Sequence, residues 1–177
     1  TEVMDRNATI QPADLTVEVK DPSIKLTSEQ KLRGVLRALE KHLKAKGWQK
    51  RAMMHVNDEP FIHLLPSYKY VANIAREEAP SLKLIEAIET TDFGNALDVL
   101  VPKLNHMNLW WPYFQRSKCQ GKEVWFYTCC HPLGRYPNRF IDQPLVETRL
   151  LHWISYLYGL DGYLHWGLNW YAPDRDP

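Results

Sequence analysis

Short apolar runs alternate with amphipathic segments along most of this chain, and the alternation limits the folds that it can adopt. Five runs are typical of buried strands, and they span 51–57, 82–89, 98–104, 124–130 and 162–171. Segments with helical periodicity lie between several of them. Strands that alternate with helices favour a parallel α/β sheet with right-handed crossovers.

The first helix is predicted to begin after Thr27, because Thr27 and Gln30 have the spacing of a capping box. Gly47 supplies a C-terminal cap. The apolar face predicted to point inward comprises Leu32, Val35, Leu36, Leu39 and Leu43. We interpret the basic residues on the other side as solvated: Lys31, Arg37, Lys41 and Lys44.

Two further helices are predicted, at 67–78 and after Pro144. The second is capped by Gly159, and its predicted inward face comprises Val146, Leu150, Trp153, Ile154 and Leu157. The segment 109–119 is an aromatic-rich helix or loop. The segment 131–142 is rich in proline, glycine and asparagine, which predicts a loop long enough to carry function.

The strand ends indicate which α/β fold this is. No glycine-rich phosphate-binding motif follows a strand, which argues against a nucleotide-binding doubly wound sheet. Polar and aromatic side chains stand there instead, as in eight-stranded barrels of about 250 residues. The chain has 177 residues. We therefore predict a partial (β/α)8 barrel over 27–177, roughly its last five βα units, after an irregular lead-in at 1–26 with a possible strand at 15–19.

Composition argues against several classes of protein. A net charge of +1 provides no basic field for nucleic acid or an anionic membrane, and no apolar run approaches the roughly 18 residues of a membrane span. The three cysteines form no disulfide framework, and the seven histidines lack metal-binding spacing. We expect neither a metal nor a cofactor. Seven tryptophans and nine tyrosines suit a sugar-binding cleft or a packed core equally.

Two adjacent acidic residues, Asp58 and Glu59, stand where the run 51–57 ends. Neighbouring side chains of a regular strand face opposite ways, so these two can converge only where the strand frays into a loop. Pro60 supplies that break. Like charges held close raise one pKa, which is useful when one carboxyl must be protonated and the other ionised. A solvated acidic turn is the alternative interpretation.

Several longer motifs resemble the catalytic domain of the family 123 glycoside hydrolases. They are HLKAKGW (42–48), HVNDEP (55–60), EVWFYTCCHP (123–132), YPNRFIDQPLVETRLLHW (136–153) and YGLDGYLHWGLNWY (158–171). The resemblance implies a (β/α)8 barrel that releases terminal β-linked N-acetylgalactosamine from a glycan or glycolipid. It also implies substrate-assisted retention, in which the 2-acetamido oxygen of the sugar attacks the anomeric carbon.

The acidic pair of that family corresponds to Asp58 and Glu59 in this sequence. The resemblance implies that Asp58 accepts the acetamido N–H and stabilises the oxazolinium charge, while Glu59 protonates the leaving oxygen and then activates water. The hydroxyl of Tyr127 could hold the acetamido oxygen in line for attack, although a core tyrosine is an equal alternative. Further candidate contacts to substrate are Trp110, Trp111, His131, Asn138, Arg139, Trp166 and Asn169.

Two alternative functions stay open at this point. A retaining glycosidase could use two enzyme carboxylates about 5 Å apart, Glu59 together with Glu86 or Glu89 of the next strand. A non-catalytic carbohydrate-binding protein, or an inactive fragment that lacks the first strands of the barrel, is the other alternative.

Overall fold

The computed structural model describes residues 27–167 of the chain. The predicted lead-in at 1–26, with its possible strand at 15–19, lies outside the described residues, as does the end of the last predicted strand. The elements, in order, are α1 (Ser28–Lys46), η1 (Gln49–Arg51), β1 (Met53–Met54), η2 (Ile62–Leu64), α2 (Leu65–Glu78), β2 (Lys83–Ile88), β3 (Val99–Pro102), α3 (Leu104–Leu109), α4 (Trp111–Cys119), β4 (Glu123–Thr128), α5 (Leu145–Leu157) and β5 (Gly162–His165).

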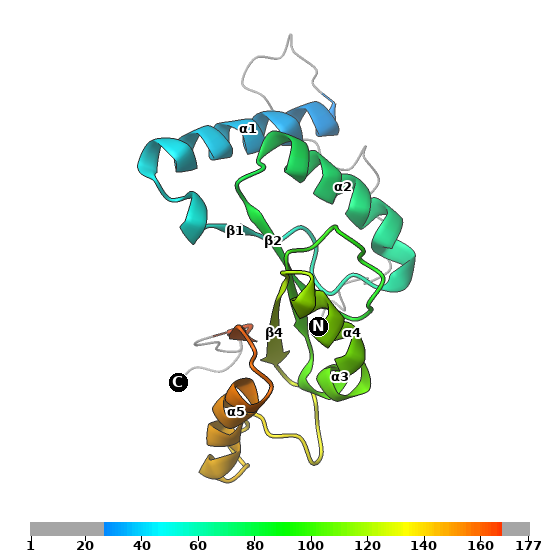
Figure 1. Cartoon of the computed structure of the whole chain (residues 1–177), viewed down its shortest axis with the longest axis vertical. Coiled ribbons are helices and arrows are strands. Elements are labelled where there is room, and N and C mark those ends of the chain that lie inside the picture. Colours follow the sequence, from blue (N-terminus) through cyan, green and yellow to red (C-terminus); the bar gives the residue numbers. More distant parts are fainter. Residues whose placement is uncertain (1–26, 168–177) are drawn as a thin grey trace, which may run out of the picture.

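The described strands form one parallel sheet in which spatial order equals sequence order, β1-β2-β3-β4-β5. Right-handed crossovers without a reversal of order place the connecting helices on one face, so the sheet curls as in a barrel. A doubly wound sheet reverses its order. In Figure 1, α1 and α2 lie side by side at one end of the molecule and α5 lies at the other. The prediction of an α/β fold with a curled parallel sheet is confirmed.

Alternation along the strands separates an inner face of the sheet from a helix face. The inner face carries Ile85, Ala87, Val99, Val101, Trp125, Tyr127 and Leu164. The helix face carries Leu84, Ile88, Leu100, Val124 and Phe126, which pack with the helices into the main core. Because both faces of β2, β3 and β4 are covered, these strands are apolar runs rather than alternating polar and apolar sequences.

The helix α1 forms as its caps predict. Thr27 and Gln30 exchange the two hydrogen bonds of a capping box, and Gly47 ends the helix with a left-handed φ of 67°. The inward face is narrower than predicted, since Leu36 and Leu43 are buried whereas Val35 is 63% exposed. The helix packs on α2 along only part of its apolar stripe.

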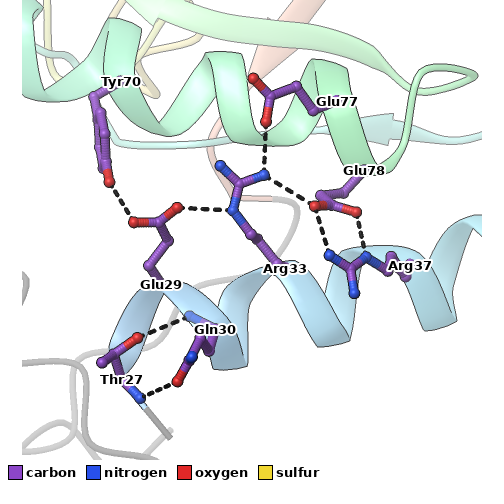
Figure 2. Close-up of polar contacts among 8 residues, drawn as sticks. All are labelled: Thr27, Glu29, Gln30, Arg33, Arg37, Tyr70, Glu77 and Glu78. Carbon is purple, nitrogen blue, oxygen red and sulfur yellow. Dashed lines mark hydrogen bonds and ion pairs between the residues drawn. The ribbon is translucent and has the colours of Figure 1, made fainter.

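Ion pairs join α1 to α2 across the part of α1 that we had expected to be solvated (Figure 2). The Nη1 atom of Arg33 lies 2.6 Å from Glu77 and 2.9 Å from Glu78, and Arg37 also pairs with Glu78. The bonds from Arg37 and Arg33 keep the pKa of Glu78 at about 2. The interpretation of Arg37 as simply solvated is therefore wrong, because α2 presents carboxylates to it.

Two other predictions differ from the structure. The predicted strand 51–57 is reduced to the two residues of β1, because the chain leaves the sheet after Met54. The helix α5 buries Leu151, which is 1% exposed, and packs Ile154 against the core. Four residues of its predicted inward face are exposed: Val146, Leu150, Trp153 and Leu157. Apolar residues surround much of this helix, so periodicity does not single out the face that contacts the sheet.

Gly162 at the start of β5 is required by a close approach. A Cβ atom at this position would lie 2.4 Å from the nearest ring atom of Trp125, its register partner on β4. We therefore expect Gly162→Ala to lower the free energy of unfolding by about 1–3 kcal/mol, because the ring must move. Urea denaturation measures this loss.

The matched control is Gly34→Ala in α1, where nothing lies within 4 Å of the added Cβ. Alanine in the interior of a helix is more stable than glycine by roughly 0.5–1 kcal/mol, so this variant should gain stability. Equal effects of the two substitutions would contradict the contact with Trp125.

Candidate active site

Side chains from four neighbouring strands meet at the carboxyl edge of the sheet. The Tyr127 hydroxyl of β4 contacts Oε1 of Glu59 through a short hydrogen bond and lies 3.2 Å from Oε1 of Glu89. The Lys103 ammonium pairs closely with Glu89 and lies 4.0 Å from Oε1 of Glu59. Glu59 follows β1, Glu89 follows β2 and Lys103 follows β3. We call these four residues the carboxylate cluster.

The inner face of the sheet explains this convergence. Glu89 is the next inward position after Ala87 on β2, and Lys103 is the next after Val101 on β3. An isolated parallel bridge places Lys103 beside Tyr127. The cluster therefore lies on the inner face of the sheet, directly beyond its apolar residues and past the last regular strand pairs.

Glu59 reaches the cluster because the chain after β1 is held in a turn by a buried carboxylate. Glu86, with 0% exposure, accepts the backbone N–H groups of Val56 and Asn57 at 3.2 and 3.1 Å. Its other oxygen lies 2.7 Å from Nδ1 of His55. Two residues further on, Glu59 adopts a left-handed φ of 42°, a conformation that costs roughly 1–2 kcal/mol for a residue other than glycine.

The two acidic neighbours point to different surroundings. Glu59 is half-buried in the cluster, whereas Asp58 is exposed. Within residues 27–167, the Asp58 carboxylate makes no hydrogen bond or ion pair, although its charge contributes to the raised pKa of His55. Tyr127 therefore converges with Glu59 and Glu89 rather than with Asp58.

Alternation along β2 decides between the two glutamates considered as a second carboxylate. Glu86 is paired in register with Leu100 of the helix face, where it approaches Tyr68 of α2. Glu89 lies on the inner side with Glu59. Glu86 is therefore excluded as a partner of Glu59, because it faces the opposite side of the sheet.

Burial and charge set the protonation of the groups around Tyr127. Burial, followed by the bond to Glu59, raises the pKa of Tyr127, so the phenol is neutral and can donate a proton. Burial alone would lower the pKa of Lys103, but Glu89 and Glu59 outweigh it and the pKa is raised. Burial lowers the pKa of His106, so this imidazole is neutral at pH 7.

A cavity of about 350 Å³ opens beside Lys103, which is the member of the cluster that lines it. Its volume is near the lower end of the range for small-molecule sites, roughly 300–1,000 Å³, which suits a single sugar ring. Two buried polar atoms on its wall, Oδ1 of Asn105 and Nδ1 of His106, have no hydrogen bond within the described part of the chain. The lining residues are Lys103, Asn105, His106, His131, Pro132, Leu133 and Tyr136.

The loop after β4 shapes this cavity, and Asn138 holds the loop together. The Asn138 amide is buried and donates to the carbonyl oxygens of Cys129 and Pro132 at 3.1 and 3.3 Å. Its oxygen accepts the N–H of Arg139 at 2.7 Å. The structure thus uses Asn138 as a brace for the loop that carries His131, and leaves the Arg139 side chain exposed.

The predicted aromatic contacts fall in different places. Trp111 packs edge-on against Tyr158 with ring centroids 4.9 Å apart, whereas its neighbour Trp110 lies 4.7 Å from the His106 ring on the cavity wall. Trp110 is therefore the tryptophan nearer the cavity. Trp166 is 57% exposed beside His165, and Asn169 lies outside the described residues.

Lys103 is the residue of this site that sequence reasoning missed, although one signal for it was present. Lys103 stands two residues beyond Val101, at the next inward position of an apolar strand that has just ended. A charged residue at that position is expensive to bury without a partner, so it predicts a carboxylate nearby.

Residues 27–167 contain no group of three or more metal-ligating side chains and no helix that is long and apolar enough to span a membrane. The three cysteines, Cys119, Cys129 and Cys130, are free thiols.

The fold and the site together define a class of protein. Carboxylates at the carboxyl edge of a curled parallel sheet, next to a cavity for one small ring, are typical of a barrel enzyme that hydrolyses glycosides. The family model described as the catalytic domain of glycoside hydrolase 123 matches residues 9–177, and the chain belongs to this family. Its substrate class is therefore carbohydrate. A search of curated proteins finds no match to the chain.

The pair formed by His55 and Glu86 should make stability depend on pH. The bond to Glu86 raises the pKa of His55 above its ordinary value near 6.5, so the pair stabilises the fold below that pH and loses this contribution as pH rises through the folded-state value. We expect His55→Ala to destabilise the protein more at about pH 5.5 than at about pH 8.5. Urea denaturation at both pH values measures the difference.

The same substitution in a Glu86→Gln background is the control, because the neutral amide no longer favours the imidazolium. The pH dependence of the His55→Ala effect should disappear there. An effect of His55→Ala that is constant with pH in the original background would contradict the ion pair.

Proposed function

We propose that this chain is the catalytic part of a glycosidase that releases terminal β-linked N-acetylhexosamine, most specifically N-acetylgalactosamine, by substrate-assisted retention. We further propose that 27–177 forms the catalytic domain and that its five strands are the last five of an eight-stranded barrel. The observation that carries the proposal is the position of Glu59. It lies in the same cluster as Lys103, which lines the cavity, while its neighbour Asp58 stays unpaired within residues 27–167.

Glu59 has the position of a general acid. It is half-buried and lies 4.0 Å from the Lys103 ammonium, which lines the cavity, and in the proposed mechanism it gives its proton to the leaving oxygen of a bound sugar. In the second half of the reaction the same carboxylate accepts a proton from water. Asp58 is the adjacent residue and is exposed. In the proposed mechanism its carboxylate accepts the acetamido N–H, and its negative charge stabilises the developing oxazolinium.

The contacts of Tyr127 modify one part of this proposal. Its hydroxyl is engaged by two carboxylates, so it can hold the acetamido oxygen only if it gives up one of these contacts. Asn105 and His106 line the cavity and are further candidates for contacts to the sugar.

The alternative with two enzyme carboxylates now concerns Glu59 and Glu89. One hydroxyl bridges their nearest oxygens, which supports considering the pair. Glu89 is only 11% exposed, and Lys103 and Tyr127 bind the same Oε1 atom, so it is poorly placed to attack an anomeric carbon. This observation favours the acetamido group of the substrate as the nucleophile.

Substitution of the acidic pair tests the assignment of residues. We expect Glu59→Gln to lower kcat/KM on a β-N-acetylgalactosaminide by roughly 10²–10⁴, the usual contribution of general acid catalysis. Asp58→Asn should lower it by roughly 10²–10³, through lost charge stabilisation. Release of the aglycone is the measurement, and Asp92→Asn, an exposed aspartate after β2, is the matched control. Normal turnover by Glu59→Gln would reject the acid assignment.

Substrates that differ only at C2 test the nucleophile. A β-galactoside without the acetamido group should not be hydrolysed, because the attacking oxygen is absent. Equal rates on the two sugars would assign attack to an enzyme carboxylate, with Glu89 as the candidate. Binding of both sugars without turnover of either would support a non-catalytic carbohydrate-binding protein instead.

A further inference from the structure

The carboxylate cluster contains one fewer proton donor than its contacts require. The Tyr127 hydroxyl has a single proton, yet it lies within hydrogen-bond distance of carboxyl oxygens on both Glu59 and Glu89. One of these contacts can be a bond donated by Tyr127. The other is favourable only if the carboxyl itself carries a proton and donates it to the phenolic oxygen.

The charges in the cluster indicate which carboxyl that is. Lys103 is close enough to Glu89 for a direct charged hydrogen bond, whereas its nitrogen lies 4.0 Å from Glu59. Coulomb attraction falls with distance, and partial burial of all three groups reduces screening by solvent. The ammonium therefore stabilises an ionised Glu89 more than an ionised Glu59. A proton taken up by the cluster resides on Glu59.

The remaining titratable neighbours do not compete for this proton. His106 faces Glu89 from α3 at 3.8 Å, and burial lowers its pKa, so it is neutral at pH 7. Cys129 packs against the buried residues of the inner face, which include Tyr127, and burial raises the pKa of its thiol, so it also stays neutral. Lys103 is consequently the one cation in contact with the cluster among residues 27–167.

We propose that Lys103, Glu89 and Tyr127 are positioning residues that hold the catalytic proton on Glu59 and then stabilise Glu59 when it has lost it. This inference rests on the proposed function, in which Glu59 is the general acid. Glu89 stays ionised and paired with Lys103 throughout. The Tyr127 hydroxyl is the moving part, since it can turn its proton toward either carboxylate.

The reaction then proceeds with all protons accounted for. In the first step, the Glu59 proton leaves the phenolic oxygen of Tyr127 and passes to the leaving oxygen, the glycosidic C–O bond breaks with its electron pair on the leaving oxygen, and the acetamido oxygen bonds to C1. The Tyr127 proton turns from Glu89 to the new Glu59 carboxylate, which is the short contact in the structure. In the second step, water loses a proton to Glu59 as its oxygen bonds to C1. The bond between C1 and the acetamido oxygen breaks with its electron pair on that oxygen, which restores the acetamido group, and the Tyr127 proton returns to Glu89.

A purely structural brace is the alternative, and the pH profile separates the two. In Glu89→Gln the negative charge beside Glu59 is gone and Lys103 is free to pair with Glu59, so the alkaline limb of the profile of kcat/KM should move to lower pH by roughly one unit or more. A brace predicts a lower kcat with the limb at its original pH. That result would overturn the proposal.

The identity of the leaving group provides a second readout. Lys103→Met lets Glu89 compete for the proton, so cleavage of a methyl β-N-acetylgalactosaminide, whose leaving group needs protonation, should fall roughly tenfold more than cleavage of the 4-nitrophenyl analogue. Lys83→Met is the matched control. Lys83 also pairs closely with a glutamate, Glu123, but this pair lies at the amino end of the strands, away from the cluster. Equal losses on both substrates would contradict the role of Lys103.

A measurement without substrate separates this inference from the proposed function. Carboxyl ¹³C NMR of the protein follows protonation of the two glutamates as pH falls, and Glu59 should be protonated before Glu89, with this order lost in Lys103→Met. Protonation of Glu89 first would overturn the inference even if hydrolysis occurs. Failure to hydrolyse any N-acetylhexosaminide, with the expected order of protonation, would overturn the proposed function alone. If Lys103→Met does not fold, Tyr127→Phe tests the same coupling.

Discussion

The site depends on the buried carboxylate of Glu86. A charge this deep costs several kcal/mol unless it is well paired, and Glu86 is paired by the His55 imidazole and the N–H groups of Val56 and Asn57. The same bonds pull the chain out of the sheet after two residues of β1. Glu59 can then turn inward with a left-handed backbone, and its neighbour remains at the surface. The strain at Glu59 is held by contacts on the opposite face of the sheet.

Glu86 and Glu89 have different surroundings because alternate residues of a strand face opposite sides of the sheet. Glu86 lies on β2 and Glu89 directly follows the strand three positions further on, so one faces the helices and the other continues the inner face. Glu86 organises backbone, whereas Glu89 meets Lys103 and Tyr127. The buried Glu86 and the partly buried Glu89 can thus lie three residues apart because separate sets of partners neutralise them. This arrangement puts Glu59, the general acid of the proposed mechanism, next to the ion pair of Lys103 and Glu89.

Local signals in the sequence determined much of this structure. The capping box at Thr27 and the glycine at Gly47 set the ends of α1, because each acts within one helical turn. The parallel α/β fold followed from the alternation of apolar runs with amphipathic segments. The end of an apolar run at Asp58 and Glu59 also predicted a candidate site, since carboxyl strand ends meet at one edge of the sheet.

Tertiary contacts decided the rest. The pattern of apolar residues indicates which residues avoid water, but it does not indicate which neighbour covers them. Packing therefore decided that β1 pairs over only two residues and that α5 buries Leu151. The partners of buried charges are likewise distant in sequence, as with Glu86 and His55 or with Lys103 and Glu89. The sequence by itself therefore determined which segment carries the acidic pair of the candidate site, Asp58 and Glu59. Only the tertiary structure decided which acid turns inward, because that choice depends on hydrogen bonds and charges brought together from four separate strands.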